Sequence, residues 1–390
     1  MRVLLVHNKY QIGGGEDALV RQELSMLRDF GAEVHFFEVD NNRIAGSVEK
    51  LRTAAQLIYS WTMRDRIAKT IEGFVPDLMH VHNFFPLISP SVYDAAACFC
   101  CPVVQTLHNY RLLCANAQLY RDGHICHECL GRTFGWPALA HGCYRNSRAG
   151  SASVAAMLAT HRLRGTWSKK VHRYIALTDF ARDLFIANTD IPEHKLVVKP
   201  NATRDPGCGD GLGEYALFVG RLTPEKGIST LLGAARSGLS LPLKIAGTGP
   251  LRSEVEAAHL RGDLIYLGEQ KPDQVKDLMK HASVLLAPSL WYEGLPMIVP
   301  EAFGSGLPII ASRIGSLSTL ITHEQNGLHV EPRNSEELSG AVHRISRDTT
   351  LRHALRRGAR STYEDLYRPE NNAAALHSIY ESAMAEFRMM

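Results

Sequence analysis

The sequence predicts an α/β protein with two doubly wound parallel-sheet domains, and three observations support this. At 390 residues, the chain is longer than a single hydrophobic core usually supports. Short runs that are apolar at nearly every position alternate with segments of helical length, which is typical of parallel strands covered on both faces. A glycine-rich segment separates two series of such runs. The predicted strands are Val3–Val6, Val34–Val39, Leu78–Val81, Val103–Leu107 and Tyr174–Leu177, then Ala216–Val219, Leu243–Ala246, Leu264–Leu267, Val284–Ala287 and Ile309–Ala311.

These runs set the expected domain boundaries. We predict a first domain at 1–204, which carries a cysteine-rich insertion at about 112–146. Residues 205–213 contain too many glycines for the interior of an element and are interpreted as the linker. A second domain follows at 214–369, and residues 370–390 end the chain with a helix.

Composition narrows the class of protein. The charged fraction of 21% and the apolar fraction of 45% are ordinary for a globular chain. No apolar run reaches the roughly 18 residues that span a bilayer, and the N-terminus enters a strand directly without a signal peptide. We therefore expect a cytoplasmic protein. The net charge is +3, and the first half is the more basic one.

The segment Tyr292–Glu301 is the most informative in the chain, because two carboxylates flank a Gly-Leu-Pro turn that can open a helix. A carboxylate accepts hydrogen bonds from hydroxyls, and a helix start offers free N–H groups to an anion. A ligand with both hydroxyls and phosphate, such as a nucleotide sugar, suits this pairing. Two solvated glutamates beside an ordinary helix start are the alternative. The expected site residues here are Glu293, Gly294, Leu295, Pro296 and Glu301.

Two cations follow the first strand of the second domain. Arg221 and Lys226 are separated by a turn that contains proline, within a Gly-Arg-x-x-x-x-Lys-Gly segment that begins at Gly220. Arginine binds phosphate oxygens with a planar fork, and lysine adds a mobile point charge. Together they suit a leaving diphosphate without a metal ion, so we expect no catalytic cofactor.

A glycine triplet, Gly13–Gly15, follows the first strand and can bring backbone amides close to a phosphate. The dinucleotide fingerprint Gly-x-Gly-x-x-Gly is not matched, because Ala18 takes the place of the last glycine. A flexible turn is the alternative interpretation. If the loop binds phosphate, Gly14 and Gly15 are the expected contacts.

Histidines mark the first domain. His108 directly follows a predicted strand, where an imidazole can bind a sugar hydroxyl or steady a developing positive charge. His80 and His82 alternate on another strand and therefore face the same side. They are interpreted as packing or acceptor residues rather than metal ligands, because no third ligand is evident.

Four cysteines, Cys114, Cys126, Cys129 and Cys143, lie in the insertion with the spacing C-x11-C-x2-C-x13-C. A cytoplasmic compartment disfavours disulfides, so a structural zinc bound by four thiolates is one interpretation. Free or transiently oxidised thiols are the other, because only one pair has the chelating spacing. His127 and His141 are substitute ligands.

The segment 161–173 places cations around Leu163, Trp167 and Val171. Arg64, Arg66 and Lys69 add positive charge to the same domain. Such a surface can rest on anionic lipid with Trp167 at the interface, or it can be an ordinary solvated face. Nucleic acid is not an expected partner, because no series of stacking aromatic residues accompanies the charge.

The segments Val219–Gly227, Ile245–Pro250, Leu267–Gly268 and Tyr292–Glu301 together resemble those of the retaining glycosyltransferases of family 4. The resemblance covers nearly the whole chain and is most specific from about Tyr215 to Pro332. It implies the GT-B fold, in which two Rossmann-like domains face each other across a cleft and the last helix crosses back onto the first domain. It also implies a donor-phosphate role for the segment at Arg221 and Lys226, adds Gly249 and Gly268 to the donor site, and places His108 near the transferred sugar.

The sequence thus predicts a retaining hexosyltransferase that uses a nucleoside-diphosphate sugar, either a GDP-sugar or a UDP-sugar, as the donor. The enzyme would transfer the sugar to a hydroxyl of a glycan or lipid-linked acceptor. The second domain binds the donor and the first binds the acceptor. Glu301 would bind the ribose and Glu293 the sugar hydroxyls, and no enzyme nucleophile is assigned. Bacterial polysaccharide or envelope assembly at the inner face of the membrane is the expected setting. Another nucleotide-sugar enzyme, such as an epimerase, and a catalytically silent sugar-binding subunit are the alternatives.

Overall fold

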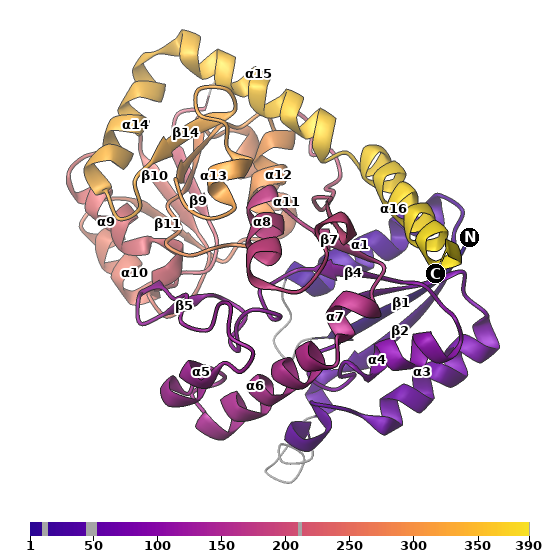
Figure 1. The fold of residues 1–390 in the computed structure, drawn as a ribbon. Coiled ribbons are helices and arrows are strands. Elements are labelled where there is room, and N and C mark those ends of the chain that lie inside the picture. Colours follow the sequence, from indigo (N-terminus) through magenta and orange to yellow (C-terminus); the bar gives the residue numbers. More distant parts are fainter. Residues whose placement is uncertain (10–14, 44–52, 210–212, 390) are drawn as a thin grey trace. The chain divides into compact units, whose positions relative to one another are not determined.

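The computed structural model describes residues 1–9, 15–43, 53–209 and 213–389 (Figure 1). The chain divides into two compact units. Unit 1 comprises residues 1–119, 126–199 and 373–390, and unit 2 comprises residues 120–125 and 200–372. The chain therefore passes from unit 1 to unit 2 after Lys199 and returns after Asn372.

Unit 1 is built on a six-stranded sheet with the order β2-β1-β3-β4-β7-β8, and every neighbouring pair is parallel. Strands β1, β3 and β4 are buried along nearly their whole length, which explains why they are apolar at successive positions. The strands are β1 Arg2–Lys9, β2 Glu33–Asp40, β3 Leu78–Asn83, β4 Val103–Leu107, β7 Arg173–Ala176 and β8 Leu196–Val198.

Helices cover this sheet, and local sequence sets several of their ends. Ser60, Ser147 and Thr178 each accept a hydrogen bond from a first-turn N–H of the helix that follows. The helices of unit 1 are α1 Gly15–Asp29, α3 Trp61–Phe74, α4 Ser91–Cys98, α5 Trp136–His141, α6 Arg148–Leu163, α7 Thr166–Lys169, α8 Asp179–Asn188 and α16 Pro369–Met389, with 3-10 turns η1 Asn41–Arg43 and η2 Glu193–Lys195.

The last helix, α16, completes the core of unit 1 (Figure 1). Ala373, Leu376, Tyr380 and Ala383 are buried in one cluster with residues of β1, α1, β3, β4 and β7. At its far end, Glu386 forms an ion pair with Arg173 of β7. The final residues of the chain are thus part of the hydrophobic core of its first domain.

Unit 2 contains a second six-stranded parallel sheet, with the order β11-β10-β9-β12-β13-β14. The order reverses between β9 and β12, and such a switch point is where doubly wound sheets bind ligands. Its elements are β9 Ala216–Val219, η3 Pro224–Lys226, α9 Ile228–Arg236, β10 Leu243–Ala246, α10 Arg252–Leu260, β11 Ile265–Gly268, α11 Pro272–Lys280, β12 Val284–Ala287, α12 Ile298–Gly304, β13 Ile309–Ser312, α13 Leu317–Leu320, β14 Gly327–Val330, α14 Ser335–Arg347 and α15 Thr349–Leu366.

The predicted fold class is confirmed, since both units are doubly wound parallel sheets flanked by helices. Each predicted strand is present, with ends that differ by a few residues. Two parallel strands were missed, Leu196–Val198 and Gly327–Val330, because both are short and both carry a partly exposed position. A two-stranded antiparallel hairpin, β5 Tyr120–Arg121 and β6 His124–Ile125, was also missed and is grouped with unit 2. Within the described residues, no helix combines the length and the apolar character that crossing a bilayer requires.

Candidate functional site

Glu293 lies in the loop between β12 and α12 and is 7% exposed, so it is not a solvated glutamate. Its Oε2 lies 2.6 Å from the Lys226 ammonium nitrogen, and Ser289 donates a hydrogen bond to its Oε1. The backbone carbonyl of Glu293 accepts a 2.7 Å hydrogen bond from Ser316. Both the carboxylate and the backbone of this residue are therefore fixed.

The loop after β9 carries Lys226, the ion-pair partner of Glu293. It turns at Gly227, where φ is +75° and a Cβ would lie 1.9 Å from the Pro288 carbonyl oxygen, so only glycine fits. Helix α9 starts directly after it. The loops after β9 and β12 are thus in contact at the switch point, which brings Lys226 to Glu293.

Arg221 has a different setting from Lys226. Its side chain is 61% exposed, and its guanidinium lies 3.4 Å from the Glu225 carboxylate. Glu225 is held in turn by a 2.7 Å hydrogen bond from Thr223. The structure therefore brings Lys226 together with Glu293 and places Arg221 on a separate, exposed ion pair.

The predicted glycines of unit 2 lie along the same sheet edge. Gly220 donates to the Ala246 carbonyl, and Leu222 donates to Thr248, so the loops after β9 and β10 run side by side. A Cβ on Gly249 would lie 2.6 Å from the Leu222 carbonyl oxygen, which requires glycine there. Gly268 ends β11, has a φ of +69°, and accepts from the Gly247 N–H.

Glu301 lies in the first turn of α12, three residues after the helix begins at Ile298. Burial raises the pKa of its carboxyl, which Lys276 only partly offsets. Its side chain has no hydrogen-bond or ion-pair partner among the described residues. Leu295, which is buried, and Pro296, which is partly buried, precede this helix, and the Pro296 carbonyl accepts a hydrogen bond from the Val299 N–H. Gly294 lies in the same loop.

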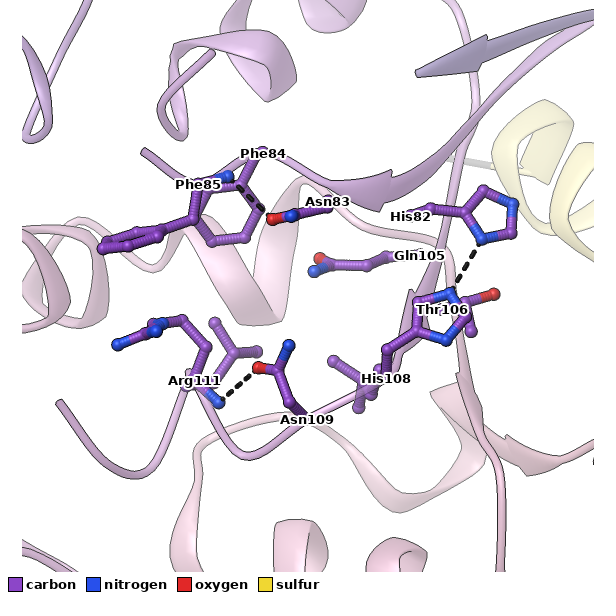
Figure 2. A pocket seen from close by; sticks show the side chains of 11 residues that line it. His82, Asn83, Phe84, Phe85, Gln105, Thr106, His108, Asn109 and Arg111 are labelled. Carbon is purple, nitrogen blue, oxygen red and sulfur yellow. Dashed lines mark hydrogen bonds between the residues drawn. The ribbon is translucent and has the colours of Figure 1, made fainter. Parts of the chain in front are cut away.

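In unit 1, His108 follows β4 and lines a small polar cavity (Figure 2). Its Nε2 lies 2.9 Å from Nδ1 of His82, and the two rings are stacked. Burial lowers the pKa of His108 well below 6.5, and the neighbouring His82 lowers it further. Arg111 lies over the Phe85 ring on another side of the cavity. With a volume of about 20 Å³, the cavity has room for a water molecule or a single hydroxyl group, but not for a whole sugar ring.

Helix α1 begins at Gly15, the last residue of the glycine triplet, and Gly14 lies outside the described residues. Among the residues that the structure describes, nothing lies within 4 Å of a Cβ built on Gly15. Glu16, in the first turn of α1, accepts a 3.5 Å hydrogen bond from Asn109, the residue after His108.

Sequence reasoning missed a buried acid beneath the histidines. Glu23 of α1 lies 3.3 Å from Nδ1 of His80 and 3.1 Å from Nε2 of His82, so a third candidate ligand does exist, contrary to our expectation. Lys199, at the end of β8, lies 3.3 Å from the same carboxylate, and this cation disfavours a metal ion there. One signal in the sequence could have indicated this buried acid. Glu23 lies among the apolar, inward-facing positions Val20, Leu24 and Leu27 of α1.

The four cysteines of the insertion form no disulfide and are only partly buried. Burial raises the pKa of the Cys129 thiol to about 11, and Cys114, Cys143 and Cys126 each add to the shift. No three of these thiols, within the described part of the chain, lie close enough together to share a metal ion. His141 lies 3.1 Å from Glu128, which links α5 to the Cys-x2-Cys turn.

The position expected for Trp167 is wrong. This residue is 3% exposed, and its ring packs against Phe84, Tyr93 and His161 in the core of unit 1. The alternation of cations with apolar residues reflected a buried helix face rather than a surface anchor. The exposed apolar side chains nearby are Trp61, at 66%, and Leu163, at 78%.

Comparison with known proteins agrees with this arrangement. Residues 211–362 match the family model of the glycosyl transferases group 1. An uncharacterized glycosyltransferase of Methanocaldococcus jannaschii is 34% identical over 193 residues, which cover 48% of this chain and 49% of that protein. TuaC of Bacillus subtilis, named as a glycosyltransferase of teichuronic acid biosynthesis, is 29% identical over 168 residues, 43% of this chain and 42% of its own. The chain thus matches about half of the length of these relatives.

Among solved structures, the Anabaena HepE protein in complex with UDP superposes with a TM-score of 0.68 at 16% identity, covering 98% of this chain and 100% of that one. A likeness at this identity shows the fold, which is GT-B. The comparisons therefore show the GT-B fold for the whole chain and a match to the glycosyl transferases group 1 for residues 211–362.

Proposed function

We propose that the chain is a retaining hexosyltransferase that transfers a sugar from a nucleoside-diphosphate sugar to a hydroxyl acceptor. The observation that supports this most strongly is the pair of carboxylates around α12. Glu293 is buried and bonded to Lys226, whereas Glu301 is partly buried and has no partner among the described residues. A ligand that brings hydroxyl donors to Glu301 and phosphate oxygens to Lys226 satisfies both groups.

Each part of the donor has a proposed partner in unit 2. Lys226 and Arg221 stabilise the leaving diphosphate. The glycines of the loops after β9 and β10 allow the protein backbone to approach the diphosphate closely. Glu301 accepts hydrogen bonds from the ribose hydroxyls. Glu293 accepts hydrogen bonds from the sugar hydroxyls, with its carboxylate held in place by Lys226 and Ser289. The UDP complex of a protein with the same fold favours a UDP-sugar, with a GDP-sugar as the alternative.

Retention of configuration is the proposed stereochemical outcome, because the segment that carries Glu293 and Glu301 resembles that of the retaining family 4 enzymes. No residue is assigned as an attacking nucleophile. His108 of unit 1 is assigned to a sugar hydroxyl, and unit 1 to the acceptor. The match to a protein named for teichuronic acid biosynthesis favours a polysaccharide or envelope glycan as the acceptor class.

Contact with anionic lipid is a further part of this proposal, with a new anchor in place of Trp167. Exposed Trp61 packs on Tyr59, Arg64 lies over the Trp61 ring, and Arg164 lies over Tyr59. Aromatic and cationic side chains of this kind favour a charged membrane surface. Trp61→Ala should weaken co-sedimentation with phosphatidylglycerol vesicles, while Phe30→Ala, an exposed control on unit 1, should not. Equal binding of both variants would remove this contact from the proposal.

A structural zinc at Cys114, Cys126, Cys129 and Cys143 is also proposed, with free thiols as the alternative. Support comes from the Cys-x2-Cys spacing of Cys126 and Cys129 and from the partial burial of all four thiols. Binding would draw the sulfur atoms closer together and staple a segment that has little regular structure.

The decisive experiment is an assay of the purified chain against a panel of UDP-, GDP- and ADP-sugars, with slow hydrolysis of the donor as the readout. We expect release of one nucleoside diphosphate and a free sugar whose initial anomer matches that of the donor. An epimerised nucleotide sugar would favour the epimerase alternative. Nucleotide-sugar binding without turnover, with every acceptor tried, would favour the silent subunit.

A further inference from the structure

A line of four polar side chains leads through the interior of unit 1 to His108. The ammonium of Lys199 lies 3.3 Å from one oxygen of Glu23, and the other Glu23 oxygen lies 3.1 Å from Nε2 of His82. His82 Nδ1 then lies 2.9 Å from His108 Nε2 (Figure 2). These residues come from the end of β8, from α1, from β3 and from the end of β4. The parallel topology gathers them at one sheet edge.

Glu23 determines where the first shared proton in this line lies. Burial alone would raise the pKa of its carboxyl, but Lys199, then His82 and His80, outweigh burial and lower that pKa well below 4.5. A carboxylate can only accept hydrogen bonds, so the proton between Glu23 and His82 belongs to His82 Nε2. Neither atom has another hydrogen-bond partner among the described residues, and pairing them satisfies two buried polar groups.

The proton on His82 Nε2 determines the next hydrogen bond. Lys199 forms an ion pair with Glu23, so this buried carboxylate already has a cation beside it. A neutral His82 with its proton on Nε2 offers Nδ1 as an acceptor, and His108 must donate from its own Nε2. Burial keeps His108 neutral by lowering its pKa well below 6.5. Its Nδ1 is then bare and has no partner within the described part of the chain.

We propose that Glu23 and His82 are positioning residues that hold His108 in the tautomer whose Nδ1 accepts a hydrogen bond from a sugar hydroxyl. This inference rests on the proposed function, because it gives His108 a sugar substrate. It adds a direction to that contact: the sugar donates and the imidazole accepts. The opposite tautomer would place an N–H where the hydroxyl needs an acceptor.

The substitution Glu23→Gln tests this direction, because the neighbouring Lys199 orients the new amide. The ammonium attracts the amide oxygen, which turns the NH2 group toward His82 Nε2. His82 must then accept at Nε2 and carry its proton on Nδ1. As a result, His108 must accept at Nε2 and donate from Nδ1. One exchange of oxygen for nitrogen therefore reverses every hydrogen bond up to the cavity, while the shapes of the side chains stay the same.

Nitrogen NMR of histidine-labelled full-length protein reports the tautomer without any assay, with the His108 signals assigned by their loss in His108→Gln. We expect a protonated Nε2 in the wild type and a protonated Nδ1 in Glu23→Gln. Glu72→Gln, an exposed glutamate of α3, is the matched control and should leave the His108 tautomer unchanged. A wild-type His108 with its proton on Nδ1 would overturn the proposal, and this measurement does not depend on any variant folding.

Kinetics then test the consequence. With the nucleotide sugar that the wild type turns over best, Glu23→Gln should lower kcat by roughly 10- to 100-fold, because a buried hydrogen bond is lost and replaced by an opposed one. UDP binding by calorimetry should not change, since the donor residues lie in unit 2. A reversed tautomer with an unchanged kcat would overturn the positioning role. A wild type that is inactive on every nucleotide sugar would instead overturn the proposed function, and with it the role given to His108.

Discussion

The two carboxylates of Tyr292–Glu301 lie in different environments, although the sequence predicts a similar ligand-binding role for both. Glu293 is held by Lys226 and Ser289, and Glu301 is partly buried and has no partner among the described residues. The difference follows from position. Glu293 lies in a loop against the β9 segment, whereas Glu301 lies on the first turn of α12. A ligand would gain most from the carboxylate that has no partner yet.

Glu301→Ala should therefore weaken binding of the nucleoside diphosphate. The loss should be about 1.5–3 kcal/mol, the usual range for hydrogen bonds to a charged group. Folding stability should change little, since no protein contact of the carboxylate is lost. Calorimetric titration with UDP and GDP measures the change, with exposed Glu254→Ala of α10 as the control. Affinity equal to that of the wild type would refute the ribose assignment.

Substitutions of Arg221 and Lys226 should differ in their effect on folding stability. The Lys226 ammonium is paired with buried Glu293, so Lys226→Met leaves a carboxylate without its cation, which typically costs about 3–5 kcal/mol of unfolding free energy. Arg221→Met removes only an exposed ion pair worth about 0–1 kcal/mol. Both should lower turnover. Urea unfolding and donor hydrolysis of the two variants make the comparison, and an equally destabilised Arg221→Met would contradict it.

At the scale of elements, the cysteine segment at residues 112–146 contains little regular structure: two strands of two residues each and the short helix α5. Its short helix α5 and the turns around Cys114 and Cys129 are held by isolated backbone hydrogen bonds. Metal binding is the interaction that would give such a segment independent stability, because the binding free energy is also folding free energy.

If zinc is bound, elemental analysis of protein purified without chelators should approach one ion per chain. Cys126→Ser should lose the metal and make the segment sensitive to protease, because one of four ligands is absent. Cys98→Ser, an exposed cysteine outside the segment, is the matched control and should keep the ion. UDP binding by unit 2 should survive chelation. Metal-free protein that resists protease as well as metal-loaded protein would favour free thiols.

At the scale of the whole molecule, buried histidines should make stability depend on pH. Burial lowers the pKa of His7, His80, His108 and His161, and it lowers that of His172 to about 4. Below pH 6.5 the unfolded chain binds protons at these sites before the folded chain does, so stability falls as the pH falls. Above that pH their contribution is complete.

We therefore expect the free energy of unfolding of unit 1 to be level above pH 7 and to decline from about pH 6.5 toward 4. Each histidine that stays neutral in the folded state costs about 1.4 kcal/mol per pH unit below its unfolded pKa. In the folded chain the pKa of the Glu23 carboxyl lies well below 4.5. Below pH 4.5 the unfolded chain therefore binds a proton at Glu23 before the folded chain does, and the decline continues. Urea titrations at several pH values measure this. His161→Gln should reduce the slope, and a flat profile would contradict the assignment.

The sequence by itself determined the two parallel sheets and the loops that carry the donor residues, because buried strands need apolar residues at every position and tight turns need glycine. It also identified the carboxylates and cations of unit 2, whose partners follow strands of the same sheet. Only the tertiary structure decided which of them are joined: Lys226 to Glu293, Glu23 to His82, and Tyr380 of the last helix to His80. It also buried Trp167 and exposed Trp61. Such pairings depend on how distant segments meet at a sheet edge, and local periodicity records which face a residue takes but not what lies opposite it.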